Sequence, residues 1–477
     1  MEAFSEWIAF FFEYAIFYYG MFLMFSYLML AIFSIIEINK YNRRNRYINY
    51  TPLLNSPHVP GISVIAPAFN EGAVIKNGVH TLLSLNYPKF EVIIVNDGST
   101  DDSLQQLIDE YDLVVVNFFY REKVKCQPVK SVYKSTNPVY SKLIVVDKEN
   151  GQSKADASNA GINVSSYPLF LCTDIDCILH KDTLVKMVKP FVEEKTRVIA
   201  TGAVIRISNS CEVENGYLQK VRVPKQYLPL FQELEYIRAF LLGRMAWSKI
   251  NALMLVSGGI GLFDKEIVLA AGGYDHASFG EDMELISRMR MWMHDNKQKY
   301  LVTYIPESLC YTEVPASLNV FARQRTRWAK GLAQTLWIHK KIFFNPKYKI
   351  FGLLTFPYWV FFEWLAPLIE AGGVIYYVYL IITGQINWPY AIVLLLFIYS
   401  FSVMITLISI LWDDFAGMKY TRKREVLKLC LAAAAEPFAY HPLVLFFSLR
   451  GNWFFFTNKK LSWGVMTRIG FKNKTAH

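Results

Sequence analysis

Five residues, Gln324-Arg325-Thr326-Arg327-Trp328, combine cations with an indole about forty residues after the acidic tripeptide Gly280-Glu281-Asp282. A carboxylate such as Asp282 can take a proton from an acceptor hydroxyl, and a guanidinium such as Arg327 can offset the charge on a leaving diphosphate. The flat apolar face of Trp328 can hold a sugar ring. Because a long apolar stretch follows, the pattern predicts glycosyl transfer at a membrane. The alternative is that Arg327 and Trp328 only anchor a helix at the membrane interface.

Acidic residues also follow two apolar runs of the kind that forms β-strands. Asp97 ends the run Glu91–Asp97, and Asp174-Ile175-Asp176 follows the run Leu169–Thr173. In an open α/β sheet, ligands lie beyond the carboxyl ends of the strands, so these acids are predicted to meet at one edge. Mg²⁺ and Mn²⁺ take one or two carboxylates together with phosphate oxygens. The Asp-x-Asp pair is therefore a candidate site for a metal ion and a nucleotide sugar.

Short β-branched runs alternate with amphipathic segments over residues 61–319, which predicts an α/β domain with a largely parallel sheet. The predicted strands are Ile62–Pro67, Glu91–Asp97, Leu143–Val146 and Leu169–Thr173. The loop Pro67–Gly72 follows the first strand, and a helix is expected over Ala73–Leu85. We interpret Asp101 and Asp102 as residues that cap the next helix or form a turn.

Two other stretches in this domain are open to two interpretations each. Ser257–Gly261 is either an ordinary turn or a place where the backbone approaches a sugar closely, because glycine allows such an approach. The amphipathic pattern from Gln232 through Arg238 to Trp247 predicts a helix that lines the acceptor side or lies on the membrane.

The composition favours a membrane protein. Of the 477 residues, 53% are hydrophobic and 16% aromatic, and the apolar residues are gathered in blocks. The formal net charge of +10 comes mostly from basic residues beside those blocks, which indicates contact with anionic lipid and no nucleic-acid partner. The six cysteines form no Cys-x-x-Cys pair and no zinc pattern, so reduced thiols are expected.

Three apolar segments are long enough to cross a lipid bilayer. The first, Ile8–Ile36, has basic residues only after it, which places the N-terminus outside and the following domain in the cytoplasm. Basic clusters bracket the other two, Phe351–Thr383 and Tyr390–Trp412, so they are expected to form a hairpin that reaches out and back. Glu363 and Glu370 are costly inside such a segment, which suggests that its first part lies in the interface.

A fourth apolar stretch, Val426–Leu449, is interrupted by Glu436-Pro437 and His441-Pro442. A full crossing would place the basic tail Arg450–His477 outside, so a re-entrant or interfacial element is favoured over a fourth span. The predicted organisation is an anchor over residues 1–50, a catalytic domain over 51–335 and a helical hairpin with interfacial segments over 336–477.

Six motifs together resemble the processive family 2 glycosyltransferases, the synthases of cellulose, chitin, hyaluronan and poly-N-acetylglucosamine. The likeness is greatest to the bacterial poly-β-1,6-N-acetylglucosamine synthases. The motifs are Ala66–Gly72, Asp97-Gly98-Ser99, Lys154-Ala155-Asp156, Asp174-x-Asp176, Gly280-Glu281-Asp282 and Gln324–Trp328. The resemblance implies an integral membrane protein in which an α/β domain of the GT-A fold is inserted between transmembrane helices.

The same resemblance implies a role for each motif on the donor side. The donor would be a UDP-sugar, with UDP-N-acetylglucosamine favoured, and the cofactor Mg²⁺ or Mn²⁺ bound by Asp176. The uracil and ribose would be held by Asp97 together with Pro67, Asn70 and Glu71 of the loop after the first strand. The nucleotide sugar would also be supported by Lys154, Asp156 and Asp174.

On the acceptor side, the resemblance implies an inverting transfer to a growing polysaccharide. Asp282 would be the general base, and Glu281 and Trp328 would bind the acceptor. Gln324 and Arg327 would bind the diphosphate. The enzyme would lie in a bacterial inner membrane with its catalytic domain in the cytoplasm, and a small membrane partner or self-association would complete the polymer path.

Other functions fit parts of this pattern. One is a non-processive transferase that acts on a lipid-linked acceptor, and another is a synthase that uses a different UDP-sugar. A third is a catalytically silent membrane scaffold, which would be expected to lack one of the acids. Because Asp97, Asp176 and Asp282 are all present, the sequence favours an enzyme.

Overall fold

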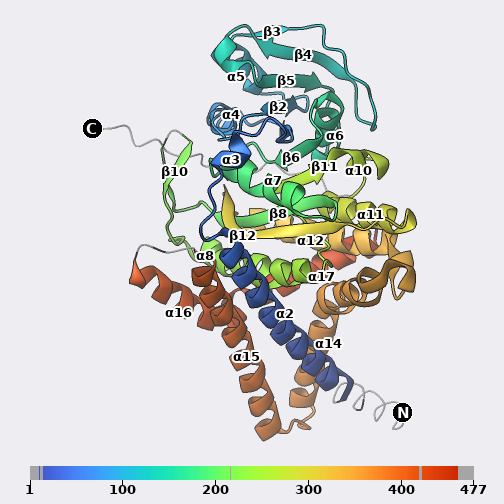
Figure 1. Ribbon diagram of the computed structural model, residues 1–477. Helices are drawn as coiled ribbons and strands as arrows, with labels where there is room; N and C mark the ends of the chain where they lie inside the picture. Colours follow the sequence, from blue (N-terminus) through green and yellow to red (C-terminus); the bar gives the residue numbers. More distant parts are fainter. Residues whose placement is uncertain (1–9, 11–13, 215, 418–419, 421, 460–477) are drawn as a thin grey trace.

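A ten-stranded mixed sheet forms the centre of the chain (Figure 1). The structure is a computed structural model and describes residues 10, 14–214, 216–417, 420 and 422–459. In their order across the sheet, the strands are β3 (Leu113–Val115), β4 (Val129–Ser135), β5 (Leu143–Lys148), β2 (Phe90–Asn96), β1 (Ile62–Ala68), β6 (Leu169–Thr173), β11 (Ile260–Asp264), β8 (Val198–Ile207), β12 (Leu301–Thr312) and β7 (Ile178–Leu179).

The four predicted strands are confirmed as β1, β2, β5 and β6, and they pair in parallel. The expectation of a largely parallel sheet is wrong. β11 runs antiparallel between β6 and β8, and β3, β4 and β7 also pair antiparallel, whereas β8 and β12 are parallel. The reason is that a short apolar run predicts a buried strand but carries no information on the direction of its neighbours.

Helices enclose the sheet. All but one of the residues of β1 and all those of β2 are buried, so both sets of alternating side chains are covered. The helix predicted after the first strand is present as α4, two residues shorter at each end. The domain helices are α4 (Ile75–Leu83), α5 (Ser103–Glu110), α6 (Lys154–Val164), α7 (Thr183–Glu193), α10 (Lys265–Ala270), α11 (Glu281–Asp295) and α12 (Leu318–Ile338).

A continuous helical run lies between the sheet and the apolar helices. It comprises α8 (Tyr227–Ile237), the π-helix η3 (Arg238–Arg244) and α9 (Met245–Lys249), and it contains the helix predicted from Gln232 to Trp247. The smaller elements are α3 (Thr51–Leu54), η2 (Pro138–Tyr140), η4 (Lys340–Ile342), η5 (Pro346–Tyr348) and the hairpin β9 (Glu212–Glu214) with β10 (Tyr217–Lys220).

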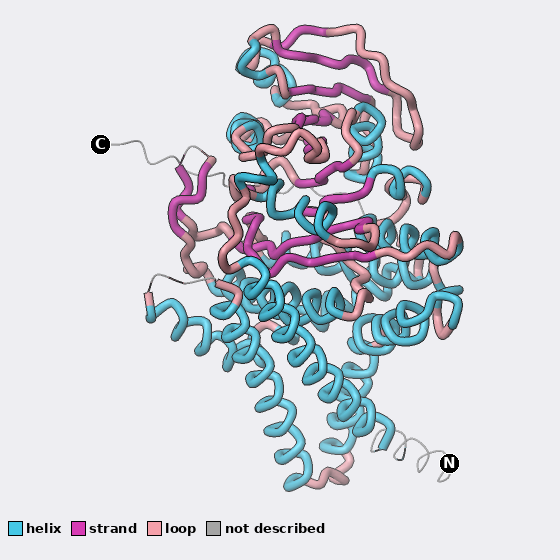
Figure 2. The backbone as a smooth tube through the Cα atoms, viewed as in Figure 1, coloured by secondary structure: helices cyan, strands magenta, loops and turns pink. Residues whose placement is uncertain are grey.

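Within the described residues, three helical segments are long and apolar enough to cross a membrane, and they extend together away from the sheet (Figure 1; Figure 2). They are α2 (Ile16–Asn45), the run Phe351–Ile382 and α15 (Trp388–Phe415). The second run is not one regular α-helix. It begins with the π-helix η6 (Phe351–Thr355), the short α-helix α13 (Phe356–Tyr358) and the π-helix η7 (Trp359–Trp364), and the regular helix α14 (Ala366–Ile382) follows. The start of the predicted first span, with Glu13, and most of the predicted basic tail, with His477, lie outside the described residues.

The fourth apolar stretch forms two helices, α16 (Lys423–Ala439) and α17 (His441–Phe456), which meet at a bend of 48°. The bend falls between the two predicted proline interruptions, and Pro442 opens α17, where a missing backbone N–H is tolerated. This geometry suits either a broken span or a re-entrant element.

Buried ion pairs join the sheet domain to the apolar helices. Arg206 of β8 pairs with Glu233 of α8 at 2.8 Å and with Asp413 of α15. Arg238 of η3 donates to both carboxylate oxygens of Glu436 in α16, at 2.7 and 3.0 Å. Because a buried charge needs its partner, these contacts fix how the two parts of the molecule sit on each other.

Candidate active site

A cavity of about 1860 Å³ lies at the carboxyl ends of β1, β2 and β6 and continues between the helices. Its lining includes every predicted site residue except Asp156: Pro67, Asn70, Glu71, Asp97, Lys154, Asp174, Asp176, Glu281, Asp282, Gln324, Arg327 and Trp328. The strand-end geometry explains this convergence, because parallel neighbours present their carboxyl ends at the same edge of the sheet.

Asn70 joins the loops that follow β1 and β2. Its backbone has a φ of 55°, in the left-handed region that asparagine tolerates better than most residues. The Thr100 backbone N–H donates to its Oδ1 at 2.8 Å, and its own N–H donates to the Ser99 hydroxyl at 3.0 Å. Asp101 forms a turn before α5, since its carboxylate accepts from the Ser103 N–H at 3.1 Å, whereas Asp102, the residue before the helix, makes no side-chain capping hydrogen bond.

Lys148 is a residue that the sequence interpretation missed. It is fully buried at the end of β5, and its Nζ lies 2.5 Å from both Asp97 Oδ1 and Asp156 Oδ2. The Asp156 carboxylate therefore contacts Lys148. It would act on a nucleotide only indirectly, through Lys148 and Asp97. The sequence offered one indication of this role: Lys148 comes at the end of an apolar run, where its cation would lie near the strand-end acids.

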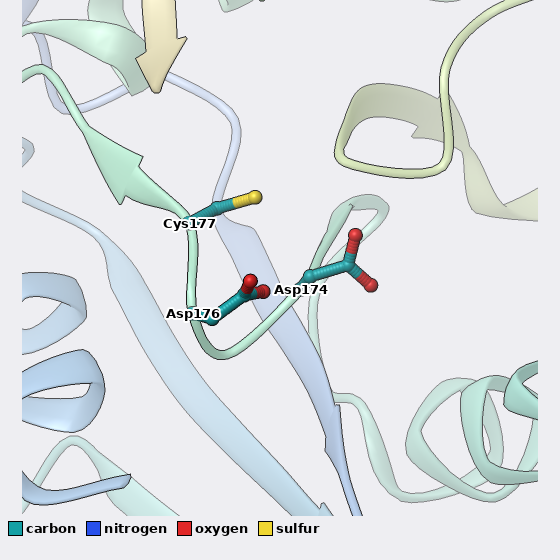
Figure 3. Close-up of side chains that lie close together, drawn as sticks. All are labelled: Asp174, Asp176 and Cys177. Carbon is teal, nitrogen blue, oxygen red and sulfur yellow. The ribbon is translucent and has the colours of Figure 1, made fainter. Parts of the chain in front are cut away.

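Among the described residues, Asp174, Asp176 and Cys177 form a group that could hold a metal ion (Figure 3). One ligand atom from each lies within 4.8 Å of the others. Two carboxylates fit Mg²⁺ or Mn²⁺, which prefer oxygen ligands, and the thiol of Cys177 adds a softer atom that the sequence interpretation did not include. These residues are therefore compatible with the expected cofactor, and Asp174 and Asp176 would hold it.

Lys154 connects this group to a glycine loop. Its ammonium pairs with Asp174 and donates to the Gly258 carbonyl oxygen at 2.7 Å. Burial is the largest influence and opposes the charge of Lys154, but the neighbouring groups, Asp174 first among them, together outweigh burial and raise the pKa of the ammonium. The stretch Ser257–Gly261, for which a turn and a pocket were both open, thus contributes its first three residues to the cavity lining.

Asp282 lies on the other side of the same loop, at the start of α11. The Gly258 N–H donates to its Oδ2 at 3.1 Å, and the Met283 N–H donates to its Oδ1 at 2.8 Å. Helix α12 crosses close to this point, because a Cβ atom added to Gly331 would lie 2.8 Å from the Gly280 nitrogen. That close approach brings the Gln324–Trp328 segment beside the two acids.

The residues of the α12 motif share one side of the helix. Gln324, Arg327 and Trp328 are separated by three and four positions, the spacing that aligns side chains on an α-helix. Trp328 is 37% exposed, and the positive charge of Arg327 is close enough to lower the pKa of Glu281. The cavity therefore has a carboxylate pair, a guanidinium and an exposed indole near one another.

Glu281 lies next to Asp282 in the first turn of α11. Burial, followed by the charge of Asp282, raises the pKa of Glu281 to about 7. Glu281 therefore takes up a proton close to neutral pH.

We expect the rate of sugar transfer to fall as the pH drops through about 7, because Glu281 then gains a proton and loses the carboxylate with which it would bind the acceptor. Glu281→Gln cannot gain this proton, so the acid limb near pH 7 should be absent from its rate profile. Rates at saturating donor between acid and neutral pH measure this change. Glu110→Gln, at the exposed end of α5, is the control, and an acid limb that stays near pH 7 in Glu281→Gln would refute the role of Glu281.

Comparison with known proteins identifies the class. Residues 60–331 match the family described as Glycosyltransferase like family 2, and the chain belongs to this family. It is therefore a glycosyltransferase, and the predicted resemblance and the predicted GT-A fold with flanking apolar helices are confirmed.

The proteins similar to this chain include synthases of one particular polysaccharide. The chain is 25% identical over 313 residues to the poly-β-1,6-N-acetyl-D-glucosamine synthase of Staphylococcus epidermidis, covering 65% of this chain and 64% of that protein. It is 27% identical over 294 residues to the same synthase of Staphylococcus aureus, covering 61% and 59%. The chain thus spans less than two thirds of these relatives.

One solved structure matches most of the chain. A mannosyltransferase from Pyrobaculum calidifontis, in complex with GDP-mannose and Mn²⁺, superposes with a TM-score of 0.50 at 17% identity. The match covers 92% of this chain and all of that one, so the likeness in fold extends to the flanking helices.

Proposed function

We propose that this protein is a membrane-embedded polysaccharide synthase that polymerises a UDP-sugar, with UDP-N-acetylglucosamine favoured, in an inverting and processive reaction. The observation that carries the proposal is the single cavity that extends from Asp97 and Asp176 past Asp282 and Trp328 to Glu363 and Glu370. A transferase that adds one sugar to a soluble acceptor has no use for a path between apolar helices. The synthase relatives support the same conclusion.

The chemistry follows from the positions of the side chains. Asp97 and the loop with Asn70 would hold the nucleoside, and a divalent ion on Asp174 and Asp176 would supply positive charge to the diphosphate. Asp282 would take the proton of the acceptor hydroxyl as its oxygen bonds to the anomeric carbon. The bond from that carbon to the diphosphate breaks on the opposite face, so the configuration inverts, and Arg327 would stabilise the departing UDP.

The acids within the apolar run support a polar path for the product. Glu363 and Glu370 both line the cavity, and Glu370 lies 2.7 Å from His441 of α17. Acids in an apolar segment generally face protein or water, so this wall would present polar groups to a sugar chain. We propose that the enzyme helps to move the polymer outward, and that a small membrane partner or self-association completes the path.

We expect the loop between α14 and α15 to lie outside a bacterial inner membrane and the sheet domain to lie in the cytoplasm, because the basic clusters flank the sheet side. An impermeant thiol reagent applied to intact cells should label a cysteine placed at Gln385 but not one at Gln152, a cavity-lining residue of the sheet domain. The N-terminus should also lie outside and position 477 inside. Labelling of a cysteine at 477 from outside would replace the three-span arrangement with four spans.

Trp328→Ala tests the acceptor side of the proposal. The variant should make shorter polymer or none with little change in donor affinity, because the indole would hold the sugar chain and not the nucleotide. Trp337→Ala removes another exposed indole from the same helix and is the matched control. Product sizing and donor titration measure both effects, and full-length polymer from Trp328→Ala at the normal rate would reduce the indole to an interface anchor.

A further inference from the structure

Three side chains from distant parts of the chain meet behind Trp328. Arg325 of α12 pairs with Glu235 of α8, and its Nη2 donates to the Tyr440 hydroxyl at 3.1 Å. Tyr440 in turn donates its hydroxyl to Glu235. We refer to Arg325, Glu235 and Tyr440 as the Arg325 cluster. Each member has two partners within the cluster, which makes it a closed network of charge-assisted hydrogen bonds.

The Arg325 cluster contacts Trp328 directly. The Arg325 guanidinium carbon lies 4.4 Å from the centre of the Trp328 ring and 4.8 Å from that of Phe321. A cation over an aromatic face is attracted by the electron density of the ring, and the attraction is stronger when the cation is desolvated. Arg325 is only 5% exposed, so it supports the indole from behind and leaves the exposed part of the indole free.

All three members of the Arg325 cluster line the cavity, but Arg325 and Tyr440 are almost fully buried. Tyr440 is 2% exposed, and its ring stacks on Phe231 with a centroid distance of 5.6 Å. Arg325 and Tyr440 therefore offer little surface to an acceptor, whereas Trp328 is 37% exposed. Their hydrogen bonds reach the exposed indole through Arg325, which lies against the Trp328 ring.

Tyr440 also occupies a special place in the chain. It is the single residue between α16 and α17, at the 48° bend. Helix α17 then runs close along α12, because a Cβ atom added to Gly451 would lie 2.5 Å from the Ala329 Cβ. The cluster thus connects the bend to the helix that carries Trp328.

We propose that Arg325, Glu235 and Tyr440 are positioning residues that fix the Trp328 indole at the acceptor end of the cavity and thereby set the length of the product. The proposal rests on the proposed function, because it needs Trp328 to hold the growing chain. It assigns roles to Arg325, the first variable position of the Gln-x-x-Arg-Trp motif, and to two residues far from the motif in the sequence. It also makes the bend between α16 and α17 part of the acceptor site.

The test uses Tyr440→Phe, which removes one hydroxyl and retains the ring and its stacking. Mean product length should fall about fivefold, the factor that corresponds to roughly 1 kcal/mol for a lost hydrogen bond, with donor KM and the initial rate of sugar addition little changed. Glu235→Gln should act in the same direction. Tyr420→Phe is the matched control, because the Tyr420 hydroxyl donates to Glu233 at 2.9 Å in the separate buried cluster of Arg206.

A double variant shows whether the effect passes through Trp328. Trp328→Ala with Tyr440→Phe should shorten the product no further than Trp328→Ala alone, because residues that act through one another are not additive. Full-length product from both Tyr440→Phe and Glu235→Gln would overturn the proposal, as would additive shortening or an equal effect of Tyr420→Phe. If the unaltered protein makes no polymer, the proposed function fails and the proposal falls with it. Polymer from the unaltered protein with full-length product from both variants refutes the positioning role alone.

Discussion

Asp282→Asn should reduce sugar transfer by a factor of about 10²–10⁴, the usual contribution of a general base, and leave donor binding nearly unchanged. The amide has the size of the carboxylate, and its one oxygen can still accept from the Gly258 N–H, so the glycine loop stays in place while the contact with the Met283 N–H is lost. What it loses is the ability to take the proton of the acceptor hydroxyl. Turnover with a UDP-sugar and calorimetric titration of the same donor measure the two effects separately.

Asp275→Asn is the matched control for this variant. Asp275 lies in the turn before α11, where its carboxylate accepts from the Ala277 N–H at 3.0 Å, and an asparagine can make the same contact. We expect its turnover to equal that of the unaltered protein. A fully active Asp282→Asn variant would exclude Asp282 as the base, and an equal loss of donor affinity would assign Asp282 to the donor site instead.

Removal of divalent ions should abolish activity, and either Mg²⁺ or Mn²⁺ should restore it. The reason is that Asp174 and Asp176 would hold the ion that offsets the charge of the diphosphate. Asp176→Asn should be inactive and should bind Mn²⁺ more weakly, which electron paramagnetic resonance of added Mn²⁺ measures without relying on turnover.

Asp182→Asn, at the start of α7 outside the cavity lining, is the control for metal binding. Undiminished turnover in excess chelator would contradict the metal requirement. Unchanged Mn²⁺ binding by Asp176→Asn would place the ion on other ligands.

The parallel core and the strand-end acids could be predicted because both are local patterns. β1, β2, β5 and β6 are apolar runs bounded by loops, and Asp97 and Asp174 follow two of them directly. The antiparallel insertion of β11 was not predictable, because its pairing with β6 and β8 depends on residues far away in the sequence.

The same distinction applies to the candidate site. Lys148 lies 51 residues from Asp97, and no spacing rule links them. The use of the Gly258 backbone by both Lys154 and Asp282 appears only when α6 and α11 are brought together. The prolines near Tyr440 indicated that the apolar stretch is interrupted there. The contact of Tyr440 with Arg325 of α12 could not be predicted from them.

The most direct test of the account is the size of the product made by the purified protein from labelled UDP-N-acetylglucosamine with Mg²⁺ or Mn²⁺ in a lipid bilayer. The account predicts a long polymer from the unaltered protein and none from Asp282→Asn. A panel of other UDP-sugars run alongside identifies the donor. A product that carries a single sugar on a lipid, with every donor in the panel, would contradict polymer synthesis and establish a non-processive transferase.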